Sequence, residues 1–273
     1  MWMIVRVAAV LLVAGVGLLI AGRGDWIIGI VEVVPGLALP QPSDPVGDAR
    51  VPPVAGIAGL VVGVVAAMLR PVARGVGQVV TLLHELGHTV VAAALGARPA
   101  GIVLRHDASG HATARWVGRQ TWARRLALAL VAFAGLPAAA TVTAAGAQLL
   151  RLLGPDAVLW GFAAAGGVVA LLARSVWSLV IAVGLVGVAL AALRDAAEPW
   201  AVAVVVGLLI AVTLRTTVDN LRRLRRPIQE GDDARAVGRR LLLPARLVQV
   251  LQVAVAAGLS GWTVWLLLPA SPG

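Results

Sequence analysis

Long runs of apolar residues, separated by short polar or arginine-rich segments, make up most of the chain. A transmembrane helix needs roughly 17–25 mainly apolar residues, and about eight runs approach or reach that length. We therefore predict an all-α, polytopic membrane protein with about eight transmembrane helices. The predicted spans are Met3–Ala21, Val54–Leu69, Gly75–Leu95, Leu126–Leu150, Ala157–Ala173, Val176–Leu193, Trp200–Leu214 and Leu247–Leu268.

The composition agrees with a membrane protein and restricts the possible metal ligands. The 273 residues are 60% hydrophobic and only 13% charged, whereas soluble domains average about 25% charged residues. The chain has no cysteine, so disulfides and thiolate metal sites are both excluded. Any metal ion would have to be bound by histidine, aspartate, glutamate or asparagine.

The formal net charge of +10 comes from arginine alone, because none of the 23 basic residues is lysine. A basic chain of this kind raises the question of nucleic-acid binding. The arginines, however, lie between the apolar runs, mainly in segments 98–125 and 215–240. Cytoplasmic loops of membrane proteins carry such an excess of basic residues. We therefore expect the lipid bilayer as the surroundings, both segments on the cytoplasmic side, and no nucleic-acid partner.

The order of the runs predicts four parts. Residues 1–53 form an N-terminal membrane helix and a proline-rich loop, and residues 54–215 form the membrane core. Residues 216–246 form a basic cytoplasmic segment, and residues 247–273 hold the C-terminal membrane helix. The chain shows no convincing internal repeat, which weighs against a secondary transporter.

A small cytoplasmic hairpin is predicted after the third apolar run. Two short apolar stretches, Ile102–Leu104 and Ala112–Val117, flank the turn-forming sequence Asp107-Ala108-Ser109-Gly110. Short strands on either side of a glycine-containing turn are typical of a β-hairpin.

The third run contains the sequence His84-Glu85-Leu86-Gly87-His88. Residues at positions i and i+4 lie on one face of a helix, so the two histidines can bind a single metal ion. Glu85 would lie beside the metal, where a carboxylate can take a proton from water. Ionisable residues inside a membrane are expensive to bury and usually functional. The alternative is a chance pattern in a buried helix, which the placement within a span makes less attractive.

Leu83–His88 followed by Val90–Gly96 resembles the catalytic helix of the site-2 protease family of intramembrane zinc metallopeptidases. Within that family the closest resemblance is to the compact bacterial branch called peptidase family fifty, B-like. Further segments resemble parts of the family in the same order, namely Ala100–Thr113, Ala134–Pro137, Ala173–Val176 and Gly231–Ala234 before Leu243-Pro244. The resemblance implies Zn²⁺ as the cofactor, His84 and His88 as ligands and Glu85 as the catalytic residue.

The third ligand is harder to assign. Well-studied members supply an aspartate from a leucine-aspartate-glycine step, which this chain lacks, although catalytic zinc usually has three protein ligands. Among acids that border apolar runs, Asp219 enters the side of the membrane assigned to the histidines, and we predict it as the ligand. Asp195, expected on the opposite side, is the second choice. Asp219 can equally be an interfacial acid paired with Arg222 or Arg223 on its own helix.

Two functions follow from these observations. The first is an intramembrane zinc metalloprotease of the bacterial cell membrane that cleaves membrane-spanning or membrane-associated protein substrates. The second is an inactive, metallopeptidase-like membrane protein that binds partners, which the missing leucine-aspartate-glycine step favours. A transporter ranks last, because the other spans hold almost no charged residues. The sequence does not indicate an oligomeric state.

Overall fold

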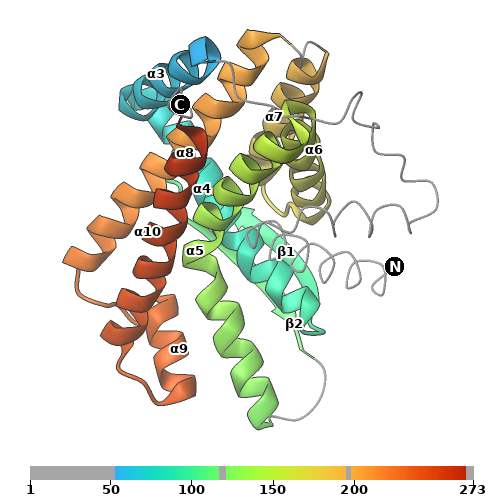
Figure 1. Ribbon diagram of the computed structural model, residues 1–273. Helices are drawn as coiled ribbons and strands as arrows, with labels where there is room; N and C mark the ends of the chain where they lie inside the picture. Colours follow the sequence, from blue (N-terminus) through green and yellow to red (C-terminus); the bar gives the residue numbers. More distant parts are fainter. Residues whose placement is uncertain (1–52, 117–120, 195–197, 269–273) are drawn as a thin grey trace.

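The computed structural model describes residues 53–116, 121–194 and 198–268. These ranges form a mostly helical structure with one two-stranded sheet (Figure 1). The predicted helix Met3–Ala21 and most of the proline-rich loop lie outside the described residues. The elements, in order, are α3 (Pro53–Met68), α4 (Arg70–Ala94), β1 (Arg98–Leu104), β2 (Gly110–Arg115), α5 (Trp122–Leu153), α6 (Pro155–Leu172), α7 (Val176–Leu193), α8 (Pro199–Arg225), α9 (Asp233–Leu241) and α10 (Ala245–Leu267).

Five of the described helices, α5, α6, α7, α8 and α10, are long and apolar enough to cross a membrane. The prediction of a helical, multi-pass membrane protein is therefore confirmed. The count needs correction, because α3 and α4 meet at a bend of 96° and pass the same test only as a pair. Two predicted spans, Val54–Leu69 and Gly75–Leu95, thus become one bent unit, which gives up to six candidates among the described residues.

Length and polarity explain this difference. Helix α3 has 16 residues and is about 24 Å long, which is short of the roughly 30 Å hydrocarbon layer. Helix α4 is long enough, but it carries Arg70, Arg74 and Gln78 in addition to the histidine motif. Neither helix has the properties of an independent span.

Glycines allow α3 to lie against α8 with almost no space between the backbones. A Cβ atom on Gly59 would lie 2.6 Å from Cβ of Val206, and one on Gly63 would lie 2.7 Å from the carbonyl oxygen of Gly207. Small residues at such crossings permit close helix packing inside membranes. This contact holds α3 at the outside of the bundle, while the bend directs α4 towards α5, α8 and the hairpin.

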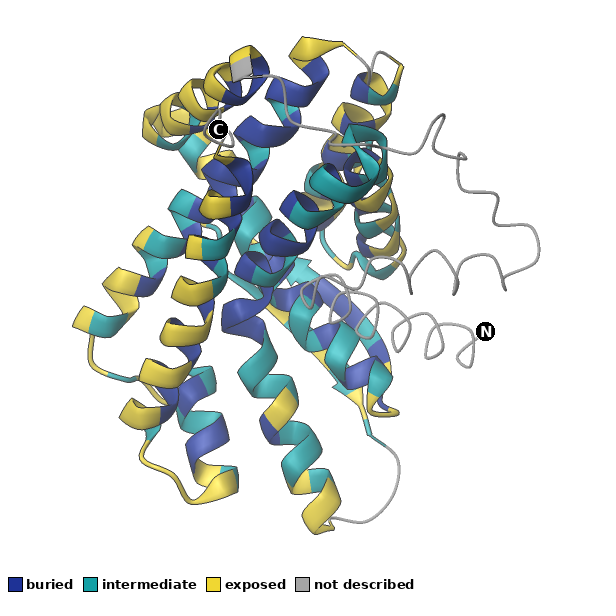
Figure 2. Cartoon of the chain, viewed as in Figure 1, coloured by how far each residue is buried: buried dark blue, intermediate teal, exposed yellow. Residues whose placement is uncertain are grey.

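Figure 2 shows buried residues on the facing sides of the helices and exposed residues on the outer sides. Helix α8 is the most enclosed of the five helices that could each cross a membrane alone, and its apolar side chains join those of α5, α6 and α7 in one core cluster. The outer faces of α3, α6 and α7 expose valine and leucine side chains, such as Val54, Leu171 and Val183. Such outer faces suit helices that are surrounded by lipid rather than water.

Helix α5 contains Pro137 in its interior. Proline has no backbone N–H, so the carbonyl of Phe133, four residues earlier, loses its helical donor. Gln252 of α10 takes that role, because its Nε2 donates to the carbonyl oxygens of Phe133 at 3.2 Å and Ala132 at 3.3 Å. The two helices are therefore joined at the proline.

Strands β1 and β2 pair antiparallel, with Leu104 opposite Gly110 and Ile102 opposite Ala112. A hairpin thus occupies the predicted place. Its turn is attached to α4: Thr81 donates to the carbonyl of Ala108 at 2.8 Å, and Gln78 donates to the carbonyls of Arg105 and His106. Its cytoplasmic location stays a prediction, as do the four-part division and the basic segment 216–246.

The start of α7 covers the other edge of β1. The backbone N–H of Leu104 donates to Oγ of Ser178 at 2.9 Å, and Ser178 donates to the carbonyl of Ile102 at 3.1 Å. Ser175 donates to the carbonyl of Leu104 at 2.8 Å. The Ala173–Val176 segment thus connects the hairpin to α7 at the edge opposite β2.

Candidate metal centre

The histidine motif lies on α4, where the spacing of four residues places both imidazoles on one face. Nε2 of His84 lies 3.2 Å from Nε2 of His88, and the two rings are nearly perpendicular, at 86°. Both side chains are mostly buried but reach a cavity of about 560 Å³. Two nitrogen donors therefore converge at one point.

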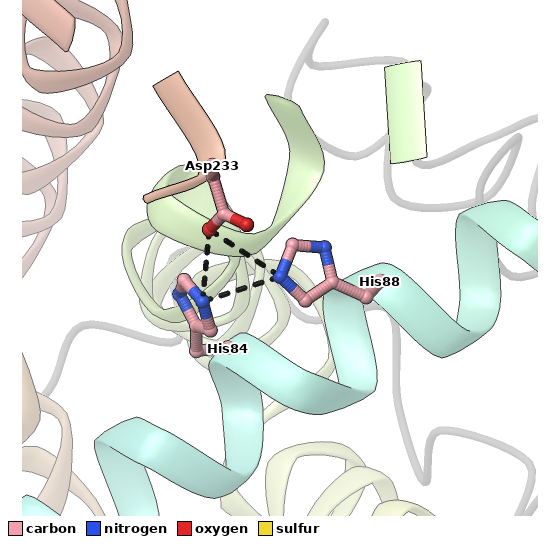
Figure 3. Close-up of side chains that lie close together, drawn as sticks. All are labelled: His84, His88 and Asp233. Carbon is pink, nitrogen blue, oxygen red and sulfur yellow. Dashed lines mark hydrogen bonds and ion pairs between the residues drawn. The ribbon is translucent and has the colours of Figure 1, made fainter. Parts of the chain in front are cut away.

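Asp233 is the third residue at that point. Its Oδ2 lies 3.1 Å from Nε2 of His84 and 3.4 Å from Nε2 of His88 (Figure 3). Among the described residues these three form the group of donors close enough together to hold a metal ion. Asp233 begins helix α9, so the ligands come from elements far apart in the sequence.

Helix α9 is short, and packing against α5 and α10 fixes its position. Ala234 and Val237 of α9 join Ala129 of α5 and Val248 of α10 in a small buried apolar cluster. The loop before α9 is closed by Asp232, whose Oδ2 accepts from the N–H of Gln229 at 2.7 Å. Asp233 is thus directed to the histidines by the docking of the whole helix.

The structure does not bring Asp219 to the histidines. Asp219 lines the same cavity, but its Oδ2 accepts from Nε of Arg215 at 2.9 Å and its Oδ1 lies 3.6 Å from Arg222. The interfacial ion pair considered for this residue is thus the arrangement observed, and Asp233 replaces it as the candidate third ligand. Asp195 lies outside the described residues.

Asp233 belongs to the Gly231–Ala234 segment, which resembles a family motif. This resemblance is the one feature of the sequence that indicates Asp233 as a candidate ligand. Asp233 is not among the acids that border apolar runs, because a basic segment and a loop separate it from the apolar part of α8.

The geometry of the three donors fits zinc. Ligand atoms held 2.0–2.2 Å from a tetrahedral zinc ion lie about 3.3–3.6 Å from one another, and the three observed separations run from 3.1 to 3.4 Å. Two imidazole nitrogens and one carboxylate oxygen form a donor set that catalytic zinc sites use, with a fourth position left for water. His84, His88 and Asp233 are therefore suitable ligands.

A hydrogen bond to the backbone orients His88. Its Nδ1 lies 2.7 Å from the carbonyl oxygen of Val131 on α5. Because a carbonyl can only accept, Nδ1 carries a proton, and Nε2, which faces His84 and Asp233, is the nitrogen that can act as a ligand when it is unprotonated. Bonds of this kind fix both the tautomer and the ring orientation of metal-binding histidines.

Gly135 provides the space for the two histidines. A Cβ atom at this position would lie 2.3 Å from Cε1 of His88 and 2.9 Å from Cε1 of His84. Helix α5 can therefore pass the imidazoles only where it has no side chain.

Glu85 lines the same cavity and is only 5% exposed. The hairpin turn lies over it, since a Cβ atom on Gly110 would be 3.2 Å from Cγ of Glu85. Thr81, Ser109 and Asn220 add polar groups to the lining. The arrangement thus places a carboxylate beside the three donor atoms but outside their cluster, where it can accept and release a proton.

The charge of Asp233 matches its place in the site. Burial raises the pKa of its carboxyl, but hydrogen bonds and charge interactions with His84 and His88 outweigh burial and hold that pKa well below its usual range. The carboxylate is therefore ionised near neutral pH, as a metal ligand must be.

A family model described as Peptidase M50B-like matches residues 57–263. The matched region contains α4 and α9, so it includes both histidines, Glu85 and Asp233. No curated protein and no solved structure gives a significant match. Because the family model covers most of the chain, and the resemblance of the motif points the same way, the chain belongs to the Peptidase M50B-like family.

Proposed function

We propose that this protein is an intramembrane zinc metalloprotease that hydrolyses peptide bonds of membrane-spanning or membrane-associated proteins. The observation that carries the proposal is the convergence of three donor atoms, 3.1–3.4 Å apart, in a cavity that also contains the buried carboxylate of Glu85. Membership of a peptidase family and the candidate membrane helices support it.

Each residue of the site has a distinct role in this proposal. His84, His88 and Asp233 would hold Zn²⁺, which when bound polarises a carbonyl group and lowers the pKa of water. Glu85 acts as the general base: a carboxylate oxygen takes a proton from the attacking water and passes it to the leaving nitrogen. The carbonyl of Val131 keeps His88 in the required tautomer.

The substrate must present an extended segment to the cavity. Peptide groups in a helix are engaged in internal hydrogen bonds and shielded by side chains, so a membrane-spanning substrate has to unwind locally. Unwound N–H and C=O groups need partners where water is scarce. Hydroxyl and amide groups in the lining, from Thr81, Ser109 and Asn220, are available for this purpose.

The test is the substitution Glu85→Gln in protein reconstituted into liposomes with a membrane-spanning test peptide. We expect cleavage to fall by roughly 10²- to 10⁴-fold while the zinc content, measured by elemental analysis, stays as in the wild type. Glu198→Gln, which changes an exposed acid at the start of α8, is the matched control and should leave cleavage unchanged.

Full cleavage by the Glu85→Gln protein would refute the proposed role. A wild-type protein that binds less than about one zinc ion per chain, cleaves no peptide and retains membrane partners would instead favour the inactive, partner-binding alternative.

We propose that the protein lies in the bacterial cell membrane with its hairpin on the cytoplasmic side, because the hairpin belongs to the arginine-rich segment 98–125 and basic loops are enriched on that side. The chain lacks cysteine, so Ser109→Cys introduces a single thiol at the turn. A membrane-impermeant thiol reagent should label this position only after the cells are broken. Labelling in intact cells would reverse the orientation.

A further inference from the structure

A second cavity, of about 730 Å³, adjoins the first along helix α9. Leu128, Ala236 and Arg240 line both cavities. The second one is otherwise formed by the start of α5, by Glu230 in the loop before α9, and by the end of α9 with the residues that follow it. No step of the proposed hydrolysis uses it.

The lining of this second cavity is strongly basic. Arg125, Arg239 and Arg240 contribute three guanidinium groups, and Glu230 is the one acidic residue among the described residues of the lining. Glu230 is 89% exposed and is shared between Arg239, at 3.6 Å, and Arg235, at 3.7 Å. Exposed ion pairs of this kind are weak and easily exchanged. The cavity therefore has an excess of positive charge that an anion can neutralise.

Large apolar side chains surround the arginines and face outwards. Trp122 is 75% exposed and Leu242 is 91% exposed, and Leu241 and Leu243 are exposed as well. Leu242 has a φ of 58°, in the left-handed region that leucine rarely adopts. This conformation ends α9 abruptly, with the N–H of Leu243 donating to the carbonyl of Gly238.

The position of the cavity corresponds to a membrane surface. Helix α9 and the starts of α5 and α10 lie at the same end of the molecule in Figure 1, and both α5 and α10 are candidate spans. Arginines and tryptophans at the ends of spans lie at headgroup depth. The guanidinium groups of the cavity suit the phosphate of a phospholipid, and the apolar side chains beside them suit its hydrocarbon part.

We propose that this cavity binds the headgroup of an anionic phospholipid. Arg125 and Arg239 bind the phosphate, which guanidinium groups recognise through paired N–H donors. Trp122 and Leu242 contact the apolar part of the same lipid. Because α9 also carries Asp233, the bound lipid lies against the helix that supplies the third metal ligand.

Native mass spectrometry of the full-length protein in detergent, titrated with phosphatidylglycerol or phosphatidylcholine, tests this proposal. The wild type should retain phosphatidylglycerol in preference. The double substitution Arg125→Gln and Arg239→Gln should weaken that binding by roughly tenfold or more. The control Arg225→Gln and Arg226→Gln changes two exposed arginines outside both cavities and should leave it nearly unchanged.

A second variant separates binding from folding. Leu242→Gly removes an apolar contact at a φ that glycine adopts freely, so it should lower lipid retention without lowering thermal stability. Equal retention of the two lipids by the wild type, or equal losses in the two arginine variants, would overturn the proposal. Displacement of the lipid by millimolar inorganic phosphate would also overturn it, because the cavity would then be a phosphate site.

Discussion

Gly135 lies so close to His88 that a Cβ atom at this glycine would be 2.3 Å from Cε1 of the imidazole. Carbon atoms in favourable contact are about 3.5–4.0 Å apart. The backbone of α5 is therefore packed directly on the face of α4 that carries His84 and His88. The same segment of α5 supplies the carbonyl of Val131 that orients His88.

Gly135→Ala should displace His88 and weaken zinc binding by at least about tenfold, in the range expected when the surroundings of a ligand are disturbed. Chelator competition on purified protein measures the affinity. Gly161→Ala on α6 is the matched control, because a Cβ atom there would meet nothing within 4 Å. Unchanged zinc affinity in the Gly135→Ala protein would show that the close approach has no role in holding the metal.

Asp233→Asn should reduce zinc affinity by more than about 100-fold. Loss of a residue that only contacts a ligand costs about 10- to 100-fold, and this substitution removes the charge of a proposed ligand itself. Asp219→Asn should leave zinc affinity nearly as in the wild type, because Asp219 is bound to Arg215 instead. The neighbouring substitution Asp232→Asn controls for damage to the loop. The opposite ranking of Asp233 and Asp219 would restore the ligand predicted from the sequence.

Ser178→Ala should lower the free energy of unfolding by about 1–3 kcal/mol, the usual cost of leaving buried polar groups without their partner. The hydroxyl of Ser178 is fully buried and bonds both Leu104 and Ile102 of β1. Ser260→Ala is the control, since Ser260 is also buried but its hydroxyl has no partner in the described part of the chain. Denaturation in mixed micelles measures both, and equal costs would contradict the assigned role of Ser178.

Gln252→Leu should cost about 1 kcal/mol, because it leaves the carbonyl of Phe133 without a donor. Pro137→Ala restores a backbone N–H to α5, and this N–H can bond Phe133 in place of the glutamine. In the Pro137→Ala background the cost of Gln252→Leu should therefore approach zero. A double-mutant cycle on the unfolding free energy measures this coupling, and additive effects would show that Gln252 does not compensate for the proline.

The long apolar elements were predictable because a membrane span needs a run of apolar residues that a single sequence displays. The predicted spans Ala157–Ala173 and Val176–Leu193 agree closely with α6 and α7. Hydropathy does not show where a helix continues beyond the membrane: the span predicted to end at Leu214 continues as α8 to Arg225. It also does not show that α3 and α4 meet at 96°: Pro71 at the start of α4 interrupts the helix, but hydropathy gives no angle between the two parts.

Part of the candidate site was likewise predictable from the sequence, and part depends on tertiary packing. The spacing of His84 and His88 on one helix places both side chains on one face, so sequence alone predicts their convergence. Asp233 reaches them only because α9 packs against α5 and α10, and no local pattern encodes that contact. Asp219 borders an apolar run on the side of the membrane predicted for the histidines. Its carboxylate, however, accepts a hydrogen bond from Arg215, one helical turn earlier on α8.

The separation of the ligands along the chain has a consequence for biosynthesis. The histidines on α4 are synthesised early, whereas Asp233 follows after α8 has been made. A nascent chain therefore lacks the complete set of three donors until most of its helices have left the ribosome. The proposed metal centre can therefore assemble only after α9 has been made and has docked against α5 and α10.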